Sequence, residues 1–522
     1  MELRFVARQL AMLLAGLVVA MSPCLVLAIV EPGAGVGARW AAAWAFAVAM
    51  AAGLLLAGGI WRWAHRAKSE GTPNNVTIDG MGRREALLLV ALTWLLGAAL
   101  AATPFWLWSE LGGAPDEHPF HGPASCYFEA VSGLTTTGAT VLTGIEQNPR
   151  AILLWRGLLH WLGGLGIVVL FVAVLPTLGM GGKRMFQAEA SATATSGVRP
   201  RVADTARSLW LIYGGLSLAA VLAYWAAGMG VFDAVVHAMS TVATGGYANY
   251  DASMGAYQTP LLQWLIIAFM LLCGVNFGLY HQLMRRRGLR QVVRDPELHL
   301  YLLLALGASL VVFFALLGEP LAVTTGETVE PRWYHTLRAG MFATASTMTT
   351  TGFATTDYEP WPVAAQVVLF VMLFVGGMAG STAGGLKVVR LLVAAKVLWA
   401  EVERSFRPRV VRTVRLGEGA IDDDRQRSVM GFLLLAVLIY GAGVGALYLL
   451  EWNHGIDAAT AASAPAACLF NVGPGFGMVG PTDNFSGFTG ASLTLLSLLM
   501  VLGRLELFAV LALLHPRFWR QN

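Results

Sequence analysis

The chain has 522 residues, of which 56% are hydrophobic and only 13% are charged, and its formal net charge is +4. A soluble domain carries about 25% charged residues, so this composition excludes an ordinary soluble globular protein. Four cysteines, Cys24, Cys126, Cys273 and Cys468, show no metal-ligand spacing. They are interpreted as small apolar packing residues rather than as a disulfide framework.

Apolar runs long enough to cross a bilayer recur along the chain, because a spanning helix needs about 20 such residues. The first, at about 9–30, is interpreted as a retained span rather than a cleaved signal peptide, since a second run follows at about 40–61. Eight further runs lie at 86–108, 153–175, 207–228, 261–280, 298–317, 363–376, 429–450 and 490–515. The sequence therefore predicts an all-α integral membrane protein.

Lysine and arginine set the expected orientation, because cytoplasmic connections carry an excess of these residues. Alternate connections are basic, at 62–84, 183–201, 285–294 and 404–427. The connections between them hold acidic residues and no lysine. Both termini are therefore expected in the cytoplasm, and the threonine-rich and glycine-rich stretches described next are expected on the outer side.

Four similar stretches punctuate the apolar pattern. They read SGLTTTGAT, TVATGGYAN, TMTTTGFATTD and NVGPGFG, and we align them on Gly138, Gly245, Gly352 and Gly473. Their spacings are 107, 107 and 121 residues. The segments that precede them lie at 123–134, 231–242, 335–348 and 457–469. About a dozen residues are too few to cross a bilayer, so these segments are predicted to be re-entrant helices.

The repeated loops predict a cation site. Backbone that is neither helix nor barrel lies at membrane depth only where protein buries it or where it lines a water-filled cavity. Four loops around one axis would form a ring of carbonyls, which can replace the hydration shell of a monovalent cation. Glycine permits the dihedrals and close approaches that such a ring requires. Threonine hydroxyls either add ligands or tie each loop to its helix. The alternative is four polar helix ends, which their recurrence at matching positions disfavours.

With these residues in view, the chain resembles the TrkH/KtrB family of potassium transporters, whose superfamily includes the plant HKT proteins. The resemblance covers about 85–522 and implies four M1–P-loop–M2 repeats around one central pore, with two extra N-terminal transmembrane helices. The implied units are 1–84 (N-terminal hairpin and cytosolic loop), 85–184 (repeat 1), 185–294 (repeat 2), 295–400 (repeat 3 with an intramembrane gating loop) and 401–522 (cytosolic connection and repeat 4).

The resemblance also implies which residues form the selectivity filter and hold K⁺. They are Thr136, Thr137, Gly138, Ala243, Thr244, Gly245, Thr350, Thr351, Gly352, Asn471, Val472 and Gly473. Some HKT proteins that favour sodium carry serine at the first glycine position. This chain has Gly138 there, so potassium is expected.

A gate is expected where VGGMAGSTAGGLKVVR, at 375–390, interrupts the apolar run that begins at 363. Each glycine weakens a helix by roughly 1 kcal/mol relative to alanine, so this span should break. The gate residues implied by the resemblance are Gly376, Gly377, Gly380, Ser381, Thr382, Gly384, Gly385, Lys387 and Arg504. Close helix packing through small residues is the alternative for the glycines. For Lys387 the alternative is a mere cytoplasmic boundary.

Arg504 lies within the last apolar run, where an arginine costs a few kcal/mol and usually faces a cavity or a partner. A salt bridge is the alternative to a position in the pore, but Glu506 is a poor local partner because residues i and i+2 point to different helix faces. Glu129 and Asp233 either concentrate cations at the mouth or favour helix starts. His160 and His237 are interpreted as packing residues rather than proton carriers.

The resemblance implies potassium uptake across the bacterial inner membrane, with K⁺ as the transported ion and no covalent cofactor. It further implies a homodimer among membrane lipids, regulated by a cytosolic nucleotide-binding RCK ring of the TrkA type. The sequence has no Gly-x4-Gly-Lys-Ser/Thr loop, and it indicates neither an enzyme nor a nucleic-acid partner. Alternatives are a sodium-permeable or K/Na-coupled transporter of the same architecture, the potassium-translocating subunit of a P-type ATPase, and a non-transporting membrane sensor.

Overall fold

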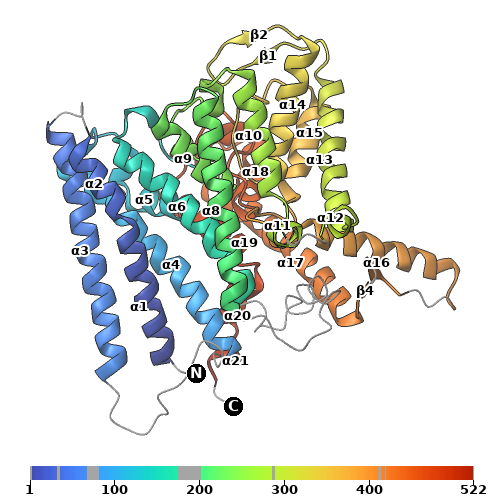
Figure 1. The fold of residues 1–522 in the computed structure, drawn as a ribbon, viewed down its shortest axis with the longest axis horizontal. Coiled ribbons are helices and arrows are strands. Elements are labelled where there is room, and N and C mark those ends of the chain that lie inside the picture. Colours follow the sequence, from blue (N-terminus) through green and yellow to red (C-terminus); the bar gives the residue numbers. More distant parts are fainter. Residues whose placement is uncertain are drawn as a thin grey trace.

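The computed structural model describes residues 3–31, 36–66, 82–173, 202–284, 288–409, 413–417 and 419–520. Figure 1 shows a bundle of helices with both marked termini at one end and the short strands β1 and β2 at the other. Among the described residues, six helices are long and apolar enough to cross a membrane, or up to eight if each of two bent pairs is one span. The prediction of a multi-pass, mainly helical membrane protein is confirmed.

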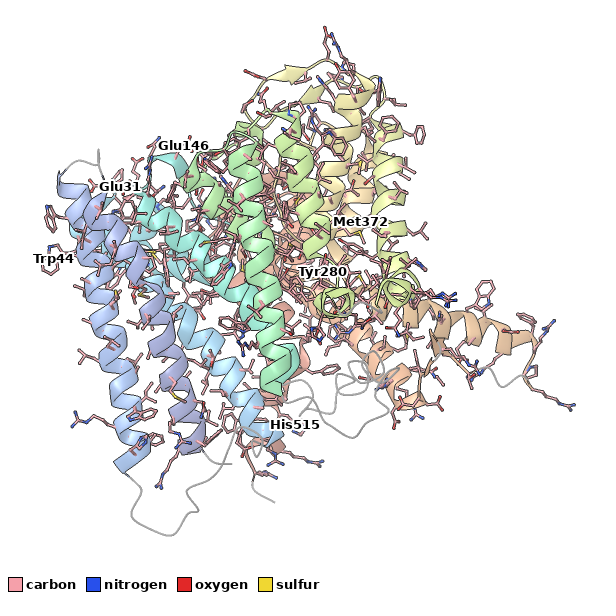
Figure 2. The ribbon with its side chains drawn as sticks, in the orientation of Figure 1. Glu31, Trp44, Glu146, Tyr280, Met372 and His515 are labelled. Atoms are coloured by element: carbon pink, nitrogen blue, oxygen red, sulfur yellow. The ribbon has the colours of Figure 1, made fainter. Side chains whose placement is uncertain are left out.

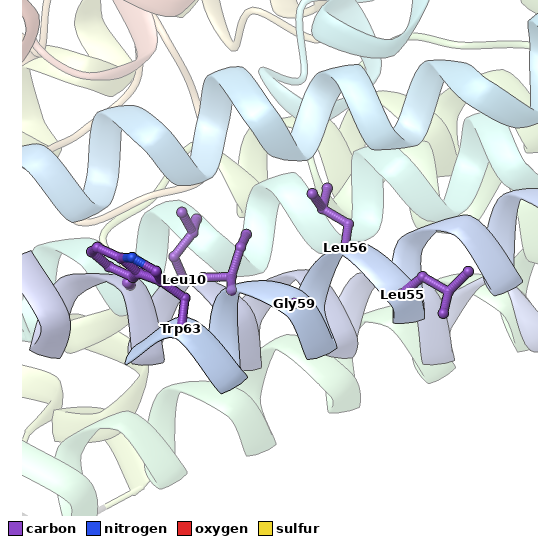
Figure 3. Close-up of a pocket in the computed structure, with 7 residues that line it drawn as sticks. Leu10, Leu55, Leu56, Gly59 and Trp63 are labelled. Carbon is purple, nitrogen blue, oxygen red and sulfur yellow. The ribbon is translucent and has the colours of Figure 1, made fainter. Parts of the chain in front are cut away.

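Three N-terminal helices form a layer at one side of the bundle in Figure 1. They are α1 (Leu3–Ala20), α2 (Ser22–Val30) and α3 (Val36–Arg66). Between α1 and α3 runs an apolar groove of about 530 Å³, lined by Leu10, Leu55 and Trp63 among others (Figure 3). Gly59 deepens it, because nothing lies within 4 Å of the position that a β-carbon would take there. Exposed apolar side chains of this kind are what a helix surface facing lipid presents.

The remaining chain forms four units, each with a long helix, a short helix and a third helical segment. Unit 1 contains α4 (Arg83–Trp108), α5 (Pro123–Leu134) and α6 (Arg150–Ala173). Unit 2 contains α8 (Val202–Ala226), α9 (Val231–Val242), α10 (Pro260–Cys273) and α11 (Phe277–Met284). Unit 3 contains α13 (Pro296–Ala315), α14 (Trp333–Met348), α15 (Val363–Phe374) and α16 (Val388–Phe406). Unit 4 contains α17 (Asp423–Leu450), α18 (Ala458–Leu469), α19 (Gly490–Arg504) and α20 (Phe508–Leu514).

Small elements connect these helices. They include α12 (Leu289–Val293), α21 (Pro516–Trp519) and the strands β1 (Leu321–Ala322), β2 (Thr328–Val329), β3 (Arg415–Leu416) and β4 (Gly419–Ala420). β1 pairs with β2 and β3 with β4, both antiparallel. Seen from the side in Figure 1, the C-terminal part of α16 projects away from the bundle.

Among the described residues, the third segment of a unit is broken in units 2, 3 and 4. The break between α15 and α16 confirms the prediction made from the glycine-rich stretch. The apolar runs 261–280 and 490–515, for which no break was predicted, are each divided into two helices. α10 and α11 meet at 92°, and α19 and α20 meet at 116°. The broken helices expose backbone groups that must be satisfied by hydrogen bonds inside the protein.

Candidate functional site

The four short helices α5, α9, α14 and α18 end in the same backbone motif. Each is followed by a non-glycine residue in the left-handed region, with φ of 52° to 55°: Thr136, Thr244, Thr350 and Asn471. The N–H of the next residue donates to the carbonyl five positions back, at 2.8–2.9 Å in all four cases. This pattern is a Schellman cap. A left-handed non-glycine costs about 1–2 kcal/mol, so its presence in four units indicates that the side chains are needed.

A glycine with positive φ lies two residues after each of these positions. The four are Gly138 (83°), Gly246 (86°), Gly352 (80°) and Gly473 (102°). The counterpart of Gly138 in the second unit is therefore Gly246, and the alignment on Gly245 is one residue out of register. By the same comparison Ala243 matches Thr135, which is the C-cap of α5. We call 135–139, 243–247, 349–353 and 470–474 loops 1 to 4.

Loops 1 to 4 contact one another in cyclic order through these glycines. A β-carbon built on each glycine would overlap a carbonyl oxygen of the next loop, where real β-carbons stay beyond 3.0 Å. The distances are 2.1 Å from Gly138 to Gly245, 2.0 Å from Gly246 to Thr351, 2.2 Å from Gly352 to Val472 and 2.6 Å from Gly473 to Thr137. The loops therefore close into a ring, and a side chain at any of the four positions would force it open.

Threonine hydroxyls tie loops 1 and 3 to their own helices. Thr135 Oγ1 donates to the Val131 carbonyl at 2.7 Å, and Thr135 and Thr137 share a hydrogen bond of 2.7 Å between their hydroxyls. Thr349 and Thr351 repeat the arrangement in loop 3. In loop 4, Asn471 Nδ2 instead donates to Thr137 Oγ1 at 2.9 Å, which links the last loop to the first. The hydroxyls of Thr135 and Thr349 therefore hold loops 1 and 3 to their helices, and the Asn471 amide joins loop 4 to loop 1.

One hollow, of about 70 Å³, touches all four left-handed glycines. Residues that follow the glycines line it, and its charged lining residues are Arg156, Asp251 and Asp483. Glu359 lies beside it and accepts a hydrogen bond from the Gly477 N–H at 2.8 Å. Burial raises the pKa of the Glu359 carboxyl, and the neighbouring Asp357 and Asp483 raise it further. The mouth of the ring therefore carries acidic groups, which attract cations.

Glu129 and Arg156 form a fully buried ion pair of 2.8 Å beside loop 1. The Glu129 carboxylate also accepts from the Val141 N–H, and Arg156 Nη1 donates to the Ala248 carbonyl at 3.1 Å. The Arg156 guanidinium lies 4.0 Å above the Tyr247 ring. Neither interpretation of Glu129 made from the sequence holds, because the carboxylate is enclosed and braces loop 1 against loop 2.

The buried His160 of α6 joins unit 1 to unit 2, and the buried His237 together with Asp233 holds unit 2 together. His160 Nδ1 lies 3.0 Å from Ser240 Oγ, and the imidazole stacks on Tyr247 at 4.1 Å. His237 Nε2 accepts from the Asn249 N–H at 3.1 Å, and Asp233 accepts from the side chain of the same asparagine at 2.7 Å. The histidines pack in the protein interior, as the sequence interpretation expects.

Residues 375–387 form a glycine-rich loop between α15 and α16, and all the predicted gate residues except Arg504 lie in it. Its ends are joined, because the Gly376 N–H donates to the Leu386 carbonyl at 2.9 Å. Its tip reaches three of the four loops or their helices. The Gly384 N–H donates to Thr350 Oγ1 at 2.6 Å, and Thr382 Oγ1 donates to the Val242 carbonyl at 3.0 Å. A β-carbon on Gly384 would lie 2.6 Å from the Phe470 carbonyl oxygen.

The contacts of the glycine-rich loop are with residues that precede the left-handed glycines, whereas the hollow is lined by residues that follow them. The loop therefore lies on the other side of the ring from the hollow. The glycine-rich loop also pairs with backbone groups at the break between α10 and α11. The Met378 N–H donates to the Gly274 carbonyl at 2.9 Å, and the Phe277 N–H donates to the Gly380 carbonyl at 3.1 Å.

Two cationic side chains sit beside the glycine-rich loop. Arg504 ends α19, is 3% exposed, and donates from Nη1 to the Thr382 carbonyl at 3.0 Å. Its Nε and Nη2 atoms have no hydrogen-bond partner among the described residues. Lys387 is buried and donates from Nζ to the Ala383 carbonyl. Glu506 does not pair with Arg504 in the described structure, as the sequence spacing predicts; it pairs with Arg390.

A ring of four loops, each at the end of a short helix, in a multi-pass membrane protein is typical of proteins that transport cations. The family model for TrkH, described as a cation transport protein, matches residues 98–520. The chain belongs to this family.

Several named relatives are similar over most of their length. The Trk system potassium uptake protein TrkH of Salmonella typhimurium is 37% identical over 458 residues, which cover 86% of this chain and 89% of the relative. TrkH of Escherichia coli K12 is 36% identical with the same coverage. The crystal structure of the potassium transporter TrkH from Vibrio parahaemolyticus matches with a TM-score of 0.83 and 32% identity, covering all of both chains.

Proposed function

We propose that this protein takes up potassium across the bacterial inner membrane, through the ring formed by loops 1 to 4. The observation that carries the proposal is the cyclic contact of Gly138, Gly246, Gly352 and Gly473 with carbonyls of the neighbouring loops. A closed ring of backbone oxygens offers a monovalent cation the ligands that it loses on leaving water. The family membership and the potassium named for the relatives support the choice of ion.

In this mechanism K⁺ gathers at the acidic hollow and sheds water into the ring. The carbonyls of Thr137, Gly245, Thr351 and Val472 are the first ligands we assign, because each lies against the glycine of the preceding loop in the ring. The Thr136 hydroxyl is buried without a hydrogen-bond partner among the described residues, so it is free to contact an ion or water. The short helices direct their carboxyl ends at the ring, and the negative ends of their dipoles favour a cation there.

The glycine-rich loop and Arg504 then act as the gate. The loop plugs the side of the ring opposite the hollow, and the positive charges of Arg504 and Lys387 oppose an approaching cation. Opening requires the loop to leave its hydrogen bonds with Thr350 and Val242. Inward movement of K⁺ gains about 2.3 kcal/mol per 100 mV of membrane potential, so the proposal needs no chemical energy source in this chain.

We further propose that both termini are cytoplasmic, that the protein is a homodimer in the membrane, and that a TrkA-like RCK ring on the cytoplasmic side controls the gate. The basic connections support this orientation, and the potassium-uptake system named for the relatives supports a partner. The second candidate is a sodium-permeable or K/Na-coupled form of the same architecture. Membership of the TrkH family favours the potassium transporter and its sodium-permeable or K/Na-coupled form over the subunit of a P-type ATPase.

The test is ion flux with purified protein in liposomes. Liposomes loaded with potassium should lose it down its gradient when they contain the protein, and faster than protein-free liposomes. Replacing potassium by sodium should slow the flux, because the proposal has the ring prefer potassium. Rates equal to those of protein-free liposomes, for a folded protein, would overturn the proposal. Parallel runs with a proton or sodium gradient would show whether transport is coupled.

A further inference from the structure

An ion pair joins the two segments that follow the gate elements in the chain. Arg390 lies in the first turn of α16, directly after the glycine-rich loop, and Glu506 lies in the break between α19 and α20, two residues after Arg504. Arg390 Nη2 donates to Glu506 Oε2. The two side chains are only 18% and 13% exposed, so water screens their attraction less than it screens that of a surface pair.

Glu506 occupies a backbone position that does not suit a glutamate. Its φ is 56°, and the N–H of Leu507 donates to the Leu502 carbonyl at 2.9 Å, so α19 ends in a Schellman cap with Glu506 at the left-handed position. Glycine is the usual residue there, because it has no β-carbon. A glutamate costs about 1–2 kcal/mol more in this conformation. The structure therefore bears a local cost in order to present this carboxylate to Arg390.

Aromatic rings fix the arginine from the other side. The Arg390 guanidinium lies 3.9 Å from the centre of the Phe432 ring of α17, which in turn packs against Phe508 at the start of α20. A cation over an aromatic face is stabilised by the quadrupole of the ring. Arg390 thus has one defined orientation, with its charge directed at the α19–α20 break.

The Arg390–Glu506 pair adds a second connection between the glycine-rich loop region and the end of α19. Arg504 Nη1 holds the Thr382 carbonyl in the glycine-rich loop, and Glu506, two residues later, holds Arg390 beyond the end of that loop. Glu297, at the start of α13, accepts from the N–H groups of Ala379 and Val389 at 2.7 and 3.1 Å, so both sides of the loop are also held to unit 3. Moving the glycine-rich loop away from the ring would strain the Arg390–Glu506 contact, because Arg390 directly follows this loop and Glu506 directly follows the Arg504 segment that holds it.

We propose that the Arg390–Glu506 pair is a latch that keeps the glycine-rich loop and Arg504 together beneath the ring. The inference deepens the proposed gate and rests on it. Arg390 and Glu506 are positioning residues, because the described contacts of their side chains are with each other and with Phe432 rather than with loops 1 to 4. Separating them releases the break after Arg504 from α16, and the gate then opens more often.

The experiment compares potassium flux of the purified protein in liposomes, without any partner, for the wild type and for Arg390→Gln and Glu506→Gln. Each variant should raise the basal flux about tenfold, within the range of coupling energies measured for contacting residues. The exchanged variant, Arg390→Glu with Glu506→Arg, should return the flux toward wild type. The ratio of potassium to sodium permeability should stay unchanged in every case, because the ring is untouched.

Two further variants separate the latch from a general effect on folding. Arg404→Gln removes a comparable 2.7 Å pair with Glu401 on the same helix, but one whose partners are 47% and 58% exposed, and it should leave the flux unchanged. Glu506→Gly relieves the left-handed backbone while it deletes the carboxylate, so the protein should remain at least as stable and still leak. A stable Glu506→Gly protein with wild-type flux overturns the latch. Absence of flux from the wild type and all variants would instead refute the proposed function.

Discussion

Replacing Gly138 with alanine places a methyl group at the contact between loops 1 and 2. The new β-carbon would lie 2.1 Å from the Gly245 carbonyl oxygen, whereas real contacts stay beyond 3.0 Å. One of the two backbones must therefore shift by about 1 Å. Since the Gly245 carbonyl is one of the four oxygens that we assign to the ion, the shift should remove or weaken one ligand of the site.

The size of the effect follows from two contributions. Alanine at a φ of 83° costs about 1–2 kcal/mol of stability wherever it occurs. A contact between a polar group and a charge is worth about 1.5–3 kcal/mol, so weakening one carbonyl ligand should cost potassium about 1.4 kcal/mol or more relative to sodium. That difference corresponds to roughly a tenfold fall in the potassium-to-sodium permeability ratio.

Gly112→Ala is the matched control. Gly112 has a similar φ of 77°, but nothing lies within 4 Å of its β-carbon position. Both variants should lose the thermal stability that a left-handed alanine costs, and Gly138→Ala should lose more because its β-carbon also overlaps the Gly245 carbonyl; only Gly138→Ala should lose selectivity in bilayer recordings. If Gly138→Ala keeps the wild-type permeability ratio, the carbonyl ring is not the site of ion choice. If both variants lose selectivity equally, the effect is one of backbone strain.

Three other predictions address the register, the gate and the brace. Gly246→Ala should reduce selectivity as Gly138→Ala does. In Gly245→Ala the new β-carbon would lie 2.2 Å from His160 Nδ1, so adding His160→Ala should rescue Gly245→Ala but not Gly246→Ala. Equal rescue of both variants would support the alignment on Gly245 instead. Arg504→Ala should increase the flux of the isolated protein, and an unchanged or lower flux in folded protein would count against a gate there. Glu129→Gln leaves its buried arginine partner uncompensated and should destabilise the protein by about 3–5 kcal/mol; an unchanged thermal midpoint would refute the brace.

Much of the site was accessible from local sequence features. The short helices could be placed because a dozen apolar residues between acidic connections cannot cross a bilayer. The break at 375–387 was predictable because its glycines weaken a helix. Gly138, Gly352 and Gly473 each occur as the only glycine in the central part of their loop, so their positions were unambiguous.

The rest depends on contacts distant in the chain. Gly245 and Gly246 are adjacent, and the positive φ of Gly246 and its close approach to the distant Thr351 carbonyl show that Gly246 matches Gly138. The stretch LGRLELF reads as an ordinary helix, and its break after Arg504 puts Glu506 next to Arg390, 116 residues earlier. The glycine and asparagine in CGVNFG were a signal for the bend between α10 and α11 that the apolar pattern concealed.

The central claim is that ions cross through the ring of loops 1 to 4 and that the ring prefers potassium. The most direct measurement is the reversal potential of the purified protein in a planar bilayer, with potassium on one side and an equal concentration of sodium on the other. A tenfold preference corresponds to about 59 mV, and we predict a shift of at least that size in the direction of potassium permeability. A reversal potential near zero, in a protein that carries current, would contradict the account.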